Sequence, residues 1–340
     1  MKILFVMNYW ANLWRSGEET LMEELAKALQ NQGAQVDFLT PFTSSFDYDI
    51  VHICGQRRYY YALVKLIVEK NIPFVISPIY FPRSLTQQTK KMINARLFHH
   101  PRELCYLMKQ AELVLPNTDA EANILNRIFG NLEHKIHVLP VGIEDRFANA
   151  DAELFRKEFG ISEPFVLNVA RIERRKNQHR LIQALQGTGL KLVIIGAIAE
   201  KKYFEETCRP ADKDGLTLFL NPIPHNSELL SSAYAACRVF ALPSHMETPG
   251  IAAMEAGLAK AAVVVTPIGG AFEYFGNHAL YCDSDSIVNI RAKILAAWDT
   301  SPEQREQLHN HLLQKYTYTQ IAKQTIEYYQ LAIKKHQKHH

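Results

Sequence analysis

The chain has 340 residues, of which 47% are apolar and 21% charged, and its formal net charge at pH 7 is +3. This length and apolar content allow a large core and favour two domains, while the near-neutral charge balance argues against nucleic acid as a partner. Five cysteines stand far apart, without a Cys-x-x-Cys spacing. We therefore expect reduced, mostly buried thiols in a cytoplasmic protein rather than a disulfide or zinc framework.

The N-terminus reads MKILFVMNYW, with one lysine and a short apolar run but no small-residue cleavage site. This pattern favours a first β-strand over a signal peptide. Because about 18 consecutive apolar residues occur nowhere in the chain, no membrane-spanning helix is expected.

In chain order, short apolar runs alternate with segments of helical periodicity. Strands are predicted in the first half at residues 2–7, 34–40, 49–55, 72–78, 111–116 and 134–140. A helix is predicted over 18–33, because Leu21, Leu25 and Leu29 recur at helical spacing before Gly33.

After residue 147 the pattern starts again, with strands predicted at 165–170, 190–196, 216–220, 237–243, 261–267 and 278–282. Runs of Val, Ile and Leu that alternate with helices are typical of parallel sheets covered on both faces. The sequence therefore predicts an α/β fold with two doubly wound, Rossmann-like domains facing a cleft. We place them at 1–148 and 149–320, and we expect a C-terminal helix and tail, 321–340, to pack back on the first domain.

The stretch PSHMETPGIAAMEAGLA at 243–259 follows a predicted strand and contains a helix start. Thr248 is a good N-cap residue, and Pro249 suits the first helical position because an N–H there has no helical partner. The sequence predicts a helix that continues through IAAMEAGLA.

Two glutamates, Glu247 and Glu255, flank this helix start. The free N–H groups of Gly250 and Ile251 form a natural anion site. A phosphate bound there would leave carboxylates on either side to accept hydrogen bonds from sugar hydroxyls. The alternative is a capped helix with two surface glutamates, and the spacing alone does not decide between the two.

A basic turn follows the first strand of the second half. Arg171 stands at the carboxyl end of that strand, and Lys176 stands at the entry to the next helix. In open α/β sheets ligands bind beyond the carboxyl ends of strands, where Arg and Lys bind phosphate oxygens. The alternative is a solvated basic turn.

Together the two segments resemble the retaining glycosyltransferases of family 4, which have the GT-B fold. That family pairs a strand-end Gly-Arg segment and a following lysine with an E-x7-E segment, and this chain has ARIERRK at 170–176 and the glutamate pair at 247 and 255. Further matches, in the family order, are MKILFV, DYDIVHICG, IHVLPVGIEDRF and VVVTPIGGAFEYF.

The resemblance implies catalytic roles for three residues. Arg171 and Lys176 would neutralise the nucleotide diphosphate, and Glu247 would contact hydroxyls of the donor sugar. It also implies a set of residues around the nucleotide-sugar, with Glu255 on the ribose hydroxyls and the first domain binding the acceptor; this set is Glu255, Thr248, Gly250, Ile251 and Gly17.

The chain departs from the family pattern in several places. Family members have Gly-Phe-Gly where this chain has Thr-Pro-Gly at 248–250, and Val141 stands where an Asn is common. Many members carry a histidine after the fourth strand of the first domain, where this chain has Ile79 and Tyr80. The histidines that stand elsewhere are more typical of plain polar residues; those considered are His52, His99, His100 and His245.

Other enzyme classes lack support. No GxGxxG follows the first strand and no GxxxxGK[ST] occurs, which argues against a nicotinamide dehydrogenase and a P-loop kinase. DYD at 47–49 and DSD at 283–285 mimic the metal-binding Asp-x-Asp, but we interpret both as solvated. Because two cations and a helix dipole can neutralise a leaving diphosphate, we expect neither a metal nor another cofactor.

We therefore predict a retaining glycosyltransferase that moves a sugar from a UDP- or GDP-linked donor to a hydroxyl acceptor. The acceptor would be a glycan, a lipid-linked glycan or a small molecule, in polysaccharide or glycoconjugate biosynthesis. The alternatives are a non-catalytic GT-B protein that binds sugar nucleotides or regulates a partner, and an NDP-sugar epimerase.

Residues 83–110 are rich in cations, with apolar residues between them. We interpret them as ordinary helices whose apolar face joins the core. The alternative is a weak, salt-sensitive contact with the inner face of the membrane through Lys90, Lys91 and Arg96.

Overall fold

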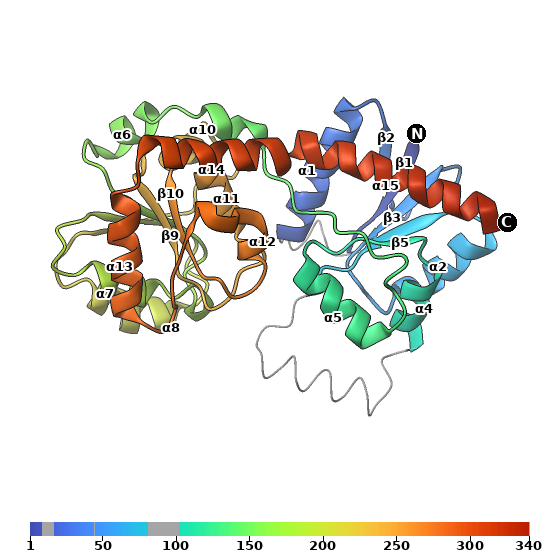
Figure 1. Cartoon of the computed structure of the whole chain (residues 1–340), viewed down its shortest axis with the longest axis horizontal. Coiled ribbons are helices and arrows are strands. Elements are labelled where there is room, and N and C mark those ends of the chain that lie inside the picture. Colours follow the sequence, from blue (N-terminus) through green and yellow to red (C-terminus); the bar gives the residue numbers. More distant parts are fainter. Residues whose placement is uncertain (9–16, 44, 81–101, 340) are drawn as a thin grey trace. The chain divides into compact units, whose positions relative to one another are not determined.

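The computed structural model describes residues 1–8, 17–43, 45–80 and 102–339, which form two units (Figure 1). The N-terminal unit consists of Met1–Gly142 and Tyr318–His340, and the C-terminal unit consists of Ile143–Thr317. The expected boundary after residue 148 therefore falls inside the short 3-10 helix η1 (Asp145–Asn149) of the C-terminal unit. Helix α15 (Tyr318–His339), which contains the expected C-terminal segment, belongs to the N-terminal unit.

The N-terminal unit is built on a five-stranded parallel sheet in the order β2-β1-β3-β4-β5. The strands are β1 (Lys2–Val6), β2 (Gln35–Phe38), β3 (Ile50–Cys54), β4 (Phe74–Ser77) and β5 (Leu113–Val114). In register, Phe5 of β1 lies beside Phe38 of β2 and His52 of β3. The order of the strands reverses direction between β1 and β3.

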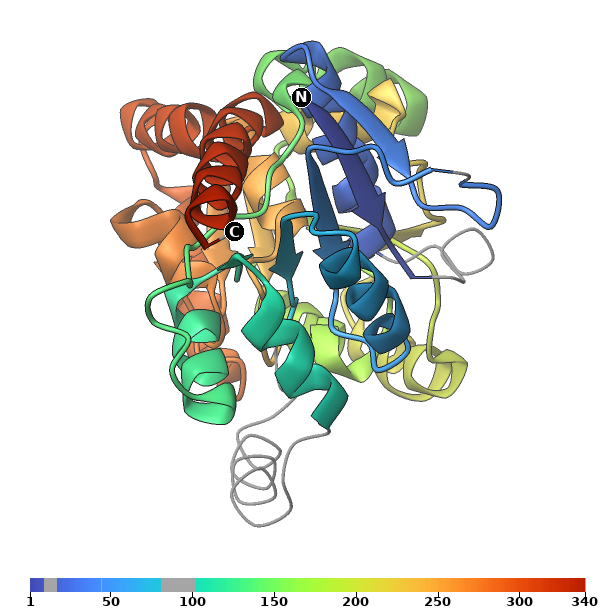
Figure 2. The ribbon, with the colours of Figure 1, turned by 90° about the vertical axis from the view of Figure 1, so that its right-hand side faces the viewer.

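Helices cover both faces of this sheet because side chains of each strand alternate between two cores. Ile3 and Phe5 face a core formed with α1 (Gly17–Asn31) and α15, which lies along the unit in red in Figure 1 and Figure 2. Leu4 and Val6 face a second core on the other side. That core is formed with α2 (Tyr60–Glu69), α4 (Arg102–Gln110) and α5 (Asp119–Phe129).

The predicted strand at 134–140 is wrong, because only an isolated bridge between Val114 and Ile136 forms there. The Val114 N–H donates to the Lys135 carbonyl, and the His137 N–H donates back to Val114. The next backbone N–H that could donate to this segment would be that of residue 116, just beyond β5, but residue 116 is a proline. Pro116 has no N–H to continue the ladder, so the segment runs beside β5 without becoming a strand.

The C-terminal unit has a six-stranded parallel sheet in the order β11-β10-β9-β6-β7-β8. The strands are β6 (Val166–Val169), β7 (Leu192–Ile195), β8 (Thr217–Leu220), β9 (Val239–Leu242), β10 (Ala262–Val265) and β11 (Leu280–Tyr281). The helices are α6 (Glu153–Phe159), α7 (Gln178–Leu185), α8 (Lys201–Tyr203), α9 (Arg209–Ala211), α10 (Glu228–Ala236), α11 (Ile251–Leu258), α12 (Ala271–Phe275), α13 (Ile287–Trp298) and α14 (Pro302–Lys315). Single-turn segments are η2 (Arg174–Lys176), the π-turn η3 (Phe204–Cys208) and η4 (Gly276–His278).

This second sheet is also covered on both faces. Alternate residues of β6, β7, β9 and β10 pack against α7 and α13 in one core. On the other face, the ring of Tyr234 in α10 packs on Phe240 of β9. Two parallel α/β sheets with helices on both faces confirm the predicted fold class. Within the residues described, no helix is both long and apolar enough to cross a membrane.

Candidate active site

Two turns of the C-terminal unit leave neighbouring strands at the point where the order of the strands reverses. The chain proceeds outward from β6 through β7 to β8, and then returns to the other side of β6 with β9. Such a switch point is where open parallel sheets bind ligands, beyond the carboxyl ends of the strands. The first turn, residues 170–177, follows β6, and the second, residues 243–250, follows β9. The basic and acidic segments of the sequence therefore meet at one edge of one sheet.

Hydrogen bonds join these two turns. Asn177, whose backbone is left-handed at φ 61°, donates from its amide to the Pro243 carbonyl at 3.0 Å. The backbone N–H of His245 donates to the Arg175 carbonyl at 2.9 Å. Both bonds run directly from one turn to the other, so they fix the positions of the basic and acidic segments relative to each other.

Lys176 and Glu247 form an ion pair at the centre of the site. Lys176 Nζ lies 2.6 Å from Glu247 Oε1, and the two side chains are only 13% and 7% exposed. Arg175 approaches the same oxygen at 3.6 Å. Burial lowers the pKa of the Lys176 ammonium, and the carboxylate of Glu247 opposes this shift. A carboxylate and an ammonium are thus held ready at the edge where a charged ligand would enter.

A glycine fixes the backbone of Glu247. The Glu247 N–H donates to the Ile268 carbonyl and the Gly270 N–H donates to the Glu247 carbonyl, each at 3.0 Å. Gly269 has φ 110°, and a Cβ added to it would lie 2.0 Å from the Glu247 carbonyl oxygen. Only glycine allows so close an approach, which gives a structural reason for the Gly-Gly pair in VVVTPIGG.

The helix that follows Glu247 starts later than predicted. Its N-cap is Gly250, with φ 90°, and α11 begins at Ile251. Thr248 and Pro249 are joined by a cis peptide and lie in the turn, so they are neither the N-cap nor the first helical residue. The prediction failed because it assumed that the turn would end as soon as a good capping residue appeared.

Glu255 lies inside α11 and has partners of its own. Its side chain is 4% exposed, and its Oε1 lies 2.7 Å from His225 Nε2. The hydroxyl of Tyr234 donates to Oε2 at 2.8 Å. The other ring nitrogen of His225 lies 3.1 Å from Glu144 Oε1. The two glutamates of the motif therefore have separate partners: Lys176 for the first and His225 with Tyr234 for the second.

His225 is protonated at neutral pH. Hydrogen bonds from its ring to Glu144 and Glu255 raise its pKa to about 10, because they favour the imidazolium over the neutral ring. Nothing in the spacing of the sequence singles out His225 or Tyr234. Glu144 does stand in the IHVLPVGIEDRF segment, which carries part of the family resemblance.

Arg171 lies at the open side of the first turn. Its side chain is 66% exposed, and its guanidinium lies 3.2 Å from Glu173, which also pairs with Arg175 at 3.1 Å. A Cβ on Gly196, just after β7, would lie 2.0 Å from the Ala170 carbonyl. This close contact holds the backbone from which Arg171 projects.

The remaining predicted residues belong to the N-terminal part of the chain. Gly17 is the first residue of α1 in the N-terminal unit, and His99 and His100 lie outside the described residues. The ring of Tyr80 is buried in the core with α2, α4 and α5. In the described part of the chain, no group of three or more His, Cys, Asp or Glu side chains is arranged to hold a metal ion.

Comparison with known proteins adds a family match within the C-terminal unit to this geometry. Residues 151–312 match the family model described as Glycosyl transferases group 1. The C-terminal unit therefore contains a glycosyltransferase group 1 domain, and the switch-point site lies within the matched residues.

Relatives and solved structures extend this likeness. An uncharacterised glycosyltransferase of Methanocaldococcus jannaschii is 28% identical over 61% of this chain and 56% of its own length. The D-inositol 3-phosphate glycosyltransferase of Xylanimonas cellulosilytica is 29% identical over 47% of this chain and 42% of its own length. The chain thus spans about half the length of these curated relatives.

Two solved structures share the fold along almost the whole chain. Sucrose-phosphate synthase from Thermosynechococcus elongatus has a TM-score of 0.75 at 16% identity and covers 97% of this chain and 98% of its own. Anabaena HepE in complex with UDP and glucose has a TM-score of 0.72 at 19% identity and covers 96% and 98%. The chain therefore has the GT-B fold, with one α/β domain in each unit.

Proposed function

We propose that the chain is a retaining glycosyltransferase that moves a sugar from a UDP- or GDP-linked donor to a hydroxyl acceptor. The observation that carries this proposal is the buried Lys176–Glu247 pair, 2.6 Å apart, at the switch-point edge of a glycosyltransferase group 1 domain. Two opposite charges in one small site suit a donor that has anionic phosphates at one end and sugar hydroxyls at the other.

Departure of the diphosphate is the most demanding step of the reaction. The bond from the anomeric carbon to the diphosphate oxygen breaks and the diphosphate takes the electron pair. The acceptor oxygen bonds to the same face of the sugar, and its proton passes to the departing diphosphate. Lys176 and the exposed Arg171 are the cations that would stabilise the departing charge. Glu247 would then accept hydrogen bonds from the sugar hydroxyls.

Glu255 is proposed to hold the ribose. Each of its oxygens already accepts one bond, from His225 and from Tyr234. A carboxylate oxygen has two lone-pair sites, so each oxygen retains capacity for one ribose hydroxyl. The protein partners would orient the carboxylate before the nucleotide arrives. We propose that backbone groups of Thr248, Gly250 and Ile251 line the sugar and phosphate.

The donor is the first property to measure. Anabaena HepE is described in complexes with UDP, with UDP and glucose and with UDP-glucose, and the catalytic domain of starch synthase IV from Arabidopsis thaliana is described with ADP and acarbose. We therefore propose a thermal-shift screen of UDP, GDP, ADP and their glucose conjugates, because at equal concentration a ligand that binds more tightly raises the melting temperature further. The conjugate with the largest shift then enters the transfer assay.

The deciding experiment compares Lys176→Ala with a matched control. We expect Lys176→Ala to lower kcat by about 10²-fold or more, as for other oriented groups that stabilise developing charge. Lys191→Ala is the control, because Lys191 precedes β7 at the opposite, amino end of the strands and pairs only loosely with Glu163, at 3.8 Å. Wild-type turnover in Lys176→Ala would refute the proposed role of the pair.

Two alternatives make different predictions in the same assays. A non-catalytic sugar-nucleotide-binding protein would show a thermal shift but release no nucleotide with any acceptor. An NDP-sugar epimerase would interconvert sugar nucleotides without an acceptor. Release of free nucleotide that is lost in Glu247→Ala favours the transferase, and the anomeric configuration of the product, read by proton NMR, tests retention.

We propose that transfer needs no metal and serves polysaccharide or glycoconjugate assembly. A chelator should leave the rate unchanged, because Arg171 and Lys176 supply the positive charge that a metal supplies in other transferases. The alternative interpretation, a membrane contact, rests on Lys90, Lys91 and Arg96, which lie outside the described residues. Helix α4, at the end of that segment, buries Leu107 and Met108 in the core, in keeping with the interpretation of ordinary helices.

A further inference from the structure

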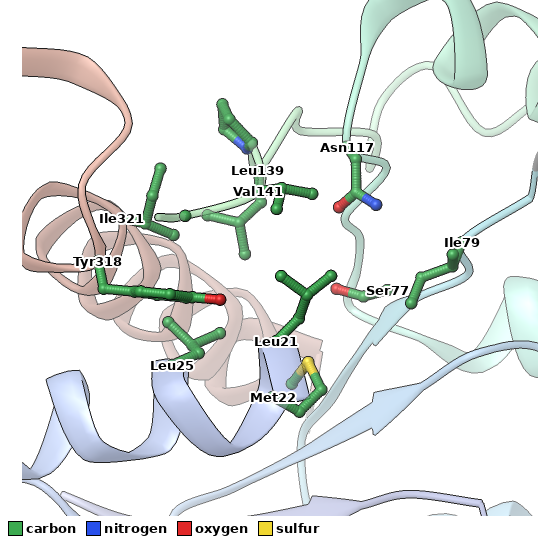
Figure 3. Close-up of a pocket in the computed structure, with 12 residues that line it drawn as sticks. Leu21, Met22, Leu25, Ser77, Ile79, Asn117, Leu139, Val141, Tyr318 and Ile321 are labelled. Atoms are coloured by element: carbon green, nitrogen blue, oxygen red, sulfur yellow. The ribbon is translucent and has the colours of Figure 1, made fainter. Parts of the chain in front are cut away.

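A small pocket opens at the carboxyl end of β4 in the N-terminal unit (Figure 3). Its volume is about 40 Å³. Its walls are mostly apolar, with side chains from α1, from α15 and from the segment 139–142, while Ser77, Asn117 and Tyr318 supply polar atoms. A water needs on the order of 10–15 Å³ by this measure, so the pocket takes a group of about three non-hydrogen atoms.

Ser77 is the end of a buried chain of three polar side chains. Its Oγ lies 2.8 Å from His52 Nε2, and His52 Nδ1 lies 2.6 Å from the hydroxyl of Tyr329. His52 and Tyr329 are fully buried and Ser77 is 6% exposed. The chain leads from α15 through β3 to the pocket at the end of β4.

The direction of these hydrogen bonds follows from the number of protons. Burial lowers the pKa of His52 to about 3, so its ring is neutral and carries a single N–H. If that proton were on Nδ1, the hydroxyl proton of Tyr329 would have no acceptor among the described residues, which is costly in a fully buried place. Tyr329 therefore donates to Nδ1 and Nε2–H donates to Ser77. The hydroxyl proton of Ser77 is then left for a group in the pocket.

A residue with a strained backbone conformation also lines this pocket. Ile79 has φ 50°, a region that β-branched residues rarely enter. The buried carboxylate of Glu121 holds this loop, because it accepts the N–H of Tyr80 and, at 2.8 Å, the N–H of Asn117. Strain of this kind persists where the surroundings enforce it and is concentrated at ligand sites.

We propose that this pocket binds a hydroxymethyl group of the acceptor, with the Ser77 hydroxyl donating to its oxygen and with His52 and Tyr329 as positioning residues. The size of the pocket, its mostly apolar walls and the hydroxyl proton of Ser77 fit a carbon that bears one hydroxyl. The identification of the ligand as the acceptor rests on the proposed function. The binding itself is tested without any transfer reaction.

The first experiment measures the tautomer of His52 in the wild-type chain by ¹⁵N NMR. We expect the Nε2–H form between pH 5 and pH 8. In Tyr329→Phe the donor to Nδ1 is gone, and the Nδ1–H form should appear. Tyr328→Phe is the matched control on the same helix, since its hydroxyl donates to the Val138 carbonyl and not to His52. An Nδ1–H ring in the wild type would overturn the proposal.

The second experiment measures binding with two sugars that differ only in the group of interest. Methyl α-D-glucopyranoside has a hydroxymethyl group, and methyl α-D-xylopyranoside lacks it. The probe is the ¹³C-methyl resonance of Met22 on the pocket wall. We expect the glucoside to shift it at a concentration roughly tenfold lower than the xyloside needs, as the loss of one hydrogen bond implies.

Variants make the same experiment decisive. Ser77→Ala and Tyr329→Phe should remove the preference for the glucoside, while Tyr328→Phe should keep it. If Ser77→Ala fails to fold, Tyr329→Phe alone carries the test, because it leaves every pocket atom in place. Equal binding of both sugars to the wild type, or no response of Met22, refutes the site. Failure of sugar transfer alone would refute only the proposed function.

Discussion

The two units each place a histidine in a hydrogen-bonded group, and the two histidines have opposite charge. His52 of the N-terminal unit is fully buried between two hydroxyls, and its pKa falls to about 3. His225 of the C-terminal unit lies between two carboxylates, and its pKa rises to about 10. The same ring is therefore a neutral relay in one unit and, at neutral pH, a cation in the other.

This difference shows that the hydrogen-bond partners of a histidine determine its charge when the ring is shielded from water. A buried imidazolium loses its hydration, and hydroxyl oxygens do not replace it, so His52 stays neutral. Glu144 and Glu255 supply full negative charge at 3.1 Å and 2.7 Å, which outweighs the partial burial of His225. The neutral histidine suits a hydrogen-bond relay to a pocket, and the charged one suits the orientation of the Glu255 carboxylate.

The largest expected effect is the acid sensitivity of the N-terminal unit. Between its ordinary pKa of 6.5 and its folded value of about 3, His52 binds a proton only in the unfolded chain. The stability it contributes is therefore complete above pH 6.5 and is lost as the pH falls toward 3, by about 1.4 kcal/mol per pH unit. Denaturant unfolding at stepped pH should show this slope.

His52→Gln is the control, because Gln does not titrate yet offers an oxygen to Tyr329 and an N–H to Ser77. We expect it to remove most of the acid slope at a small cost at pH 7. A slope that is unchanged in His52→Gln would show that other groups cause the acid sensitivity.

The next effect concerns His225, and its sign is opposite. Because its folded pKa is raised from 6.5 to about 10, its stabilisation is complete below pH 6.5 and is lost as the pH rises through 10. The side chain is 42% exposed, so water screens its contacts with the two carboxylates. His225→Gln should therefore lower the free energy of unfolding by only about 1 kcal/mol at pH 7. The difference between variant and wild type should shrink above pH 10.

His245→Gln provides the comparison within the same unit. The ring of His245 is similarly exposed, at 45%, but its nearest carboxylate, Asp285, is 3.9 Å away. We expect its unfolding free energy to match the wild type within about 0.5 kcal/mol. An equal loss in both variants would contradict the role assigned to the two carboxylates of His225.

The sequence predicts the strands of the two sheets better than it predicts the hydrogen-bonded groups around His52 and His225. Alternating apolar runs were enough to predict eleven of the twelve proposed strands, and the exception failed at Pro116, whose missing N–H breaks the ladder. Strand ends also placed Arg171, Lys176 and Glu247 at one sheet edge. In contrast, His52 pairs with Tyr329 and His225 with Glu144, far apart in the chain. No local pattern predicts such pairs, since only the packed fold brings them together.

The smallest expected effect on stability belongs to Arg171, and it separates function from folding. Its guanidinium is 66% exposed and contacts Glu173 at 3.2 Å, and Glu173 keeps Arg175 as a partner when Arg171 is removed. Exposed pairs of this kind contribute about 0–1 kcal/mol, so Arg171→Gln should change the unfolding free energy by less than about 0.5 kcal/mol. Calorimetry of UDP binding should nevertheless show a clear loss of affinity, because the diphosphate loses a planar, bidentate donor. A stability loss as large as that of His225→Gln would show that Arg171 is part of a structural network. Unchanged UDP affinity would remove Arg171 from the proposed diphosphate site, and Lys176 would then be its principal cation.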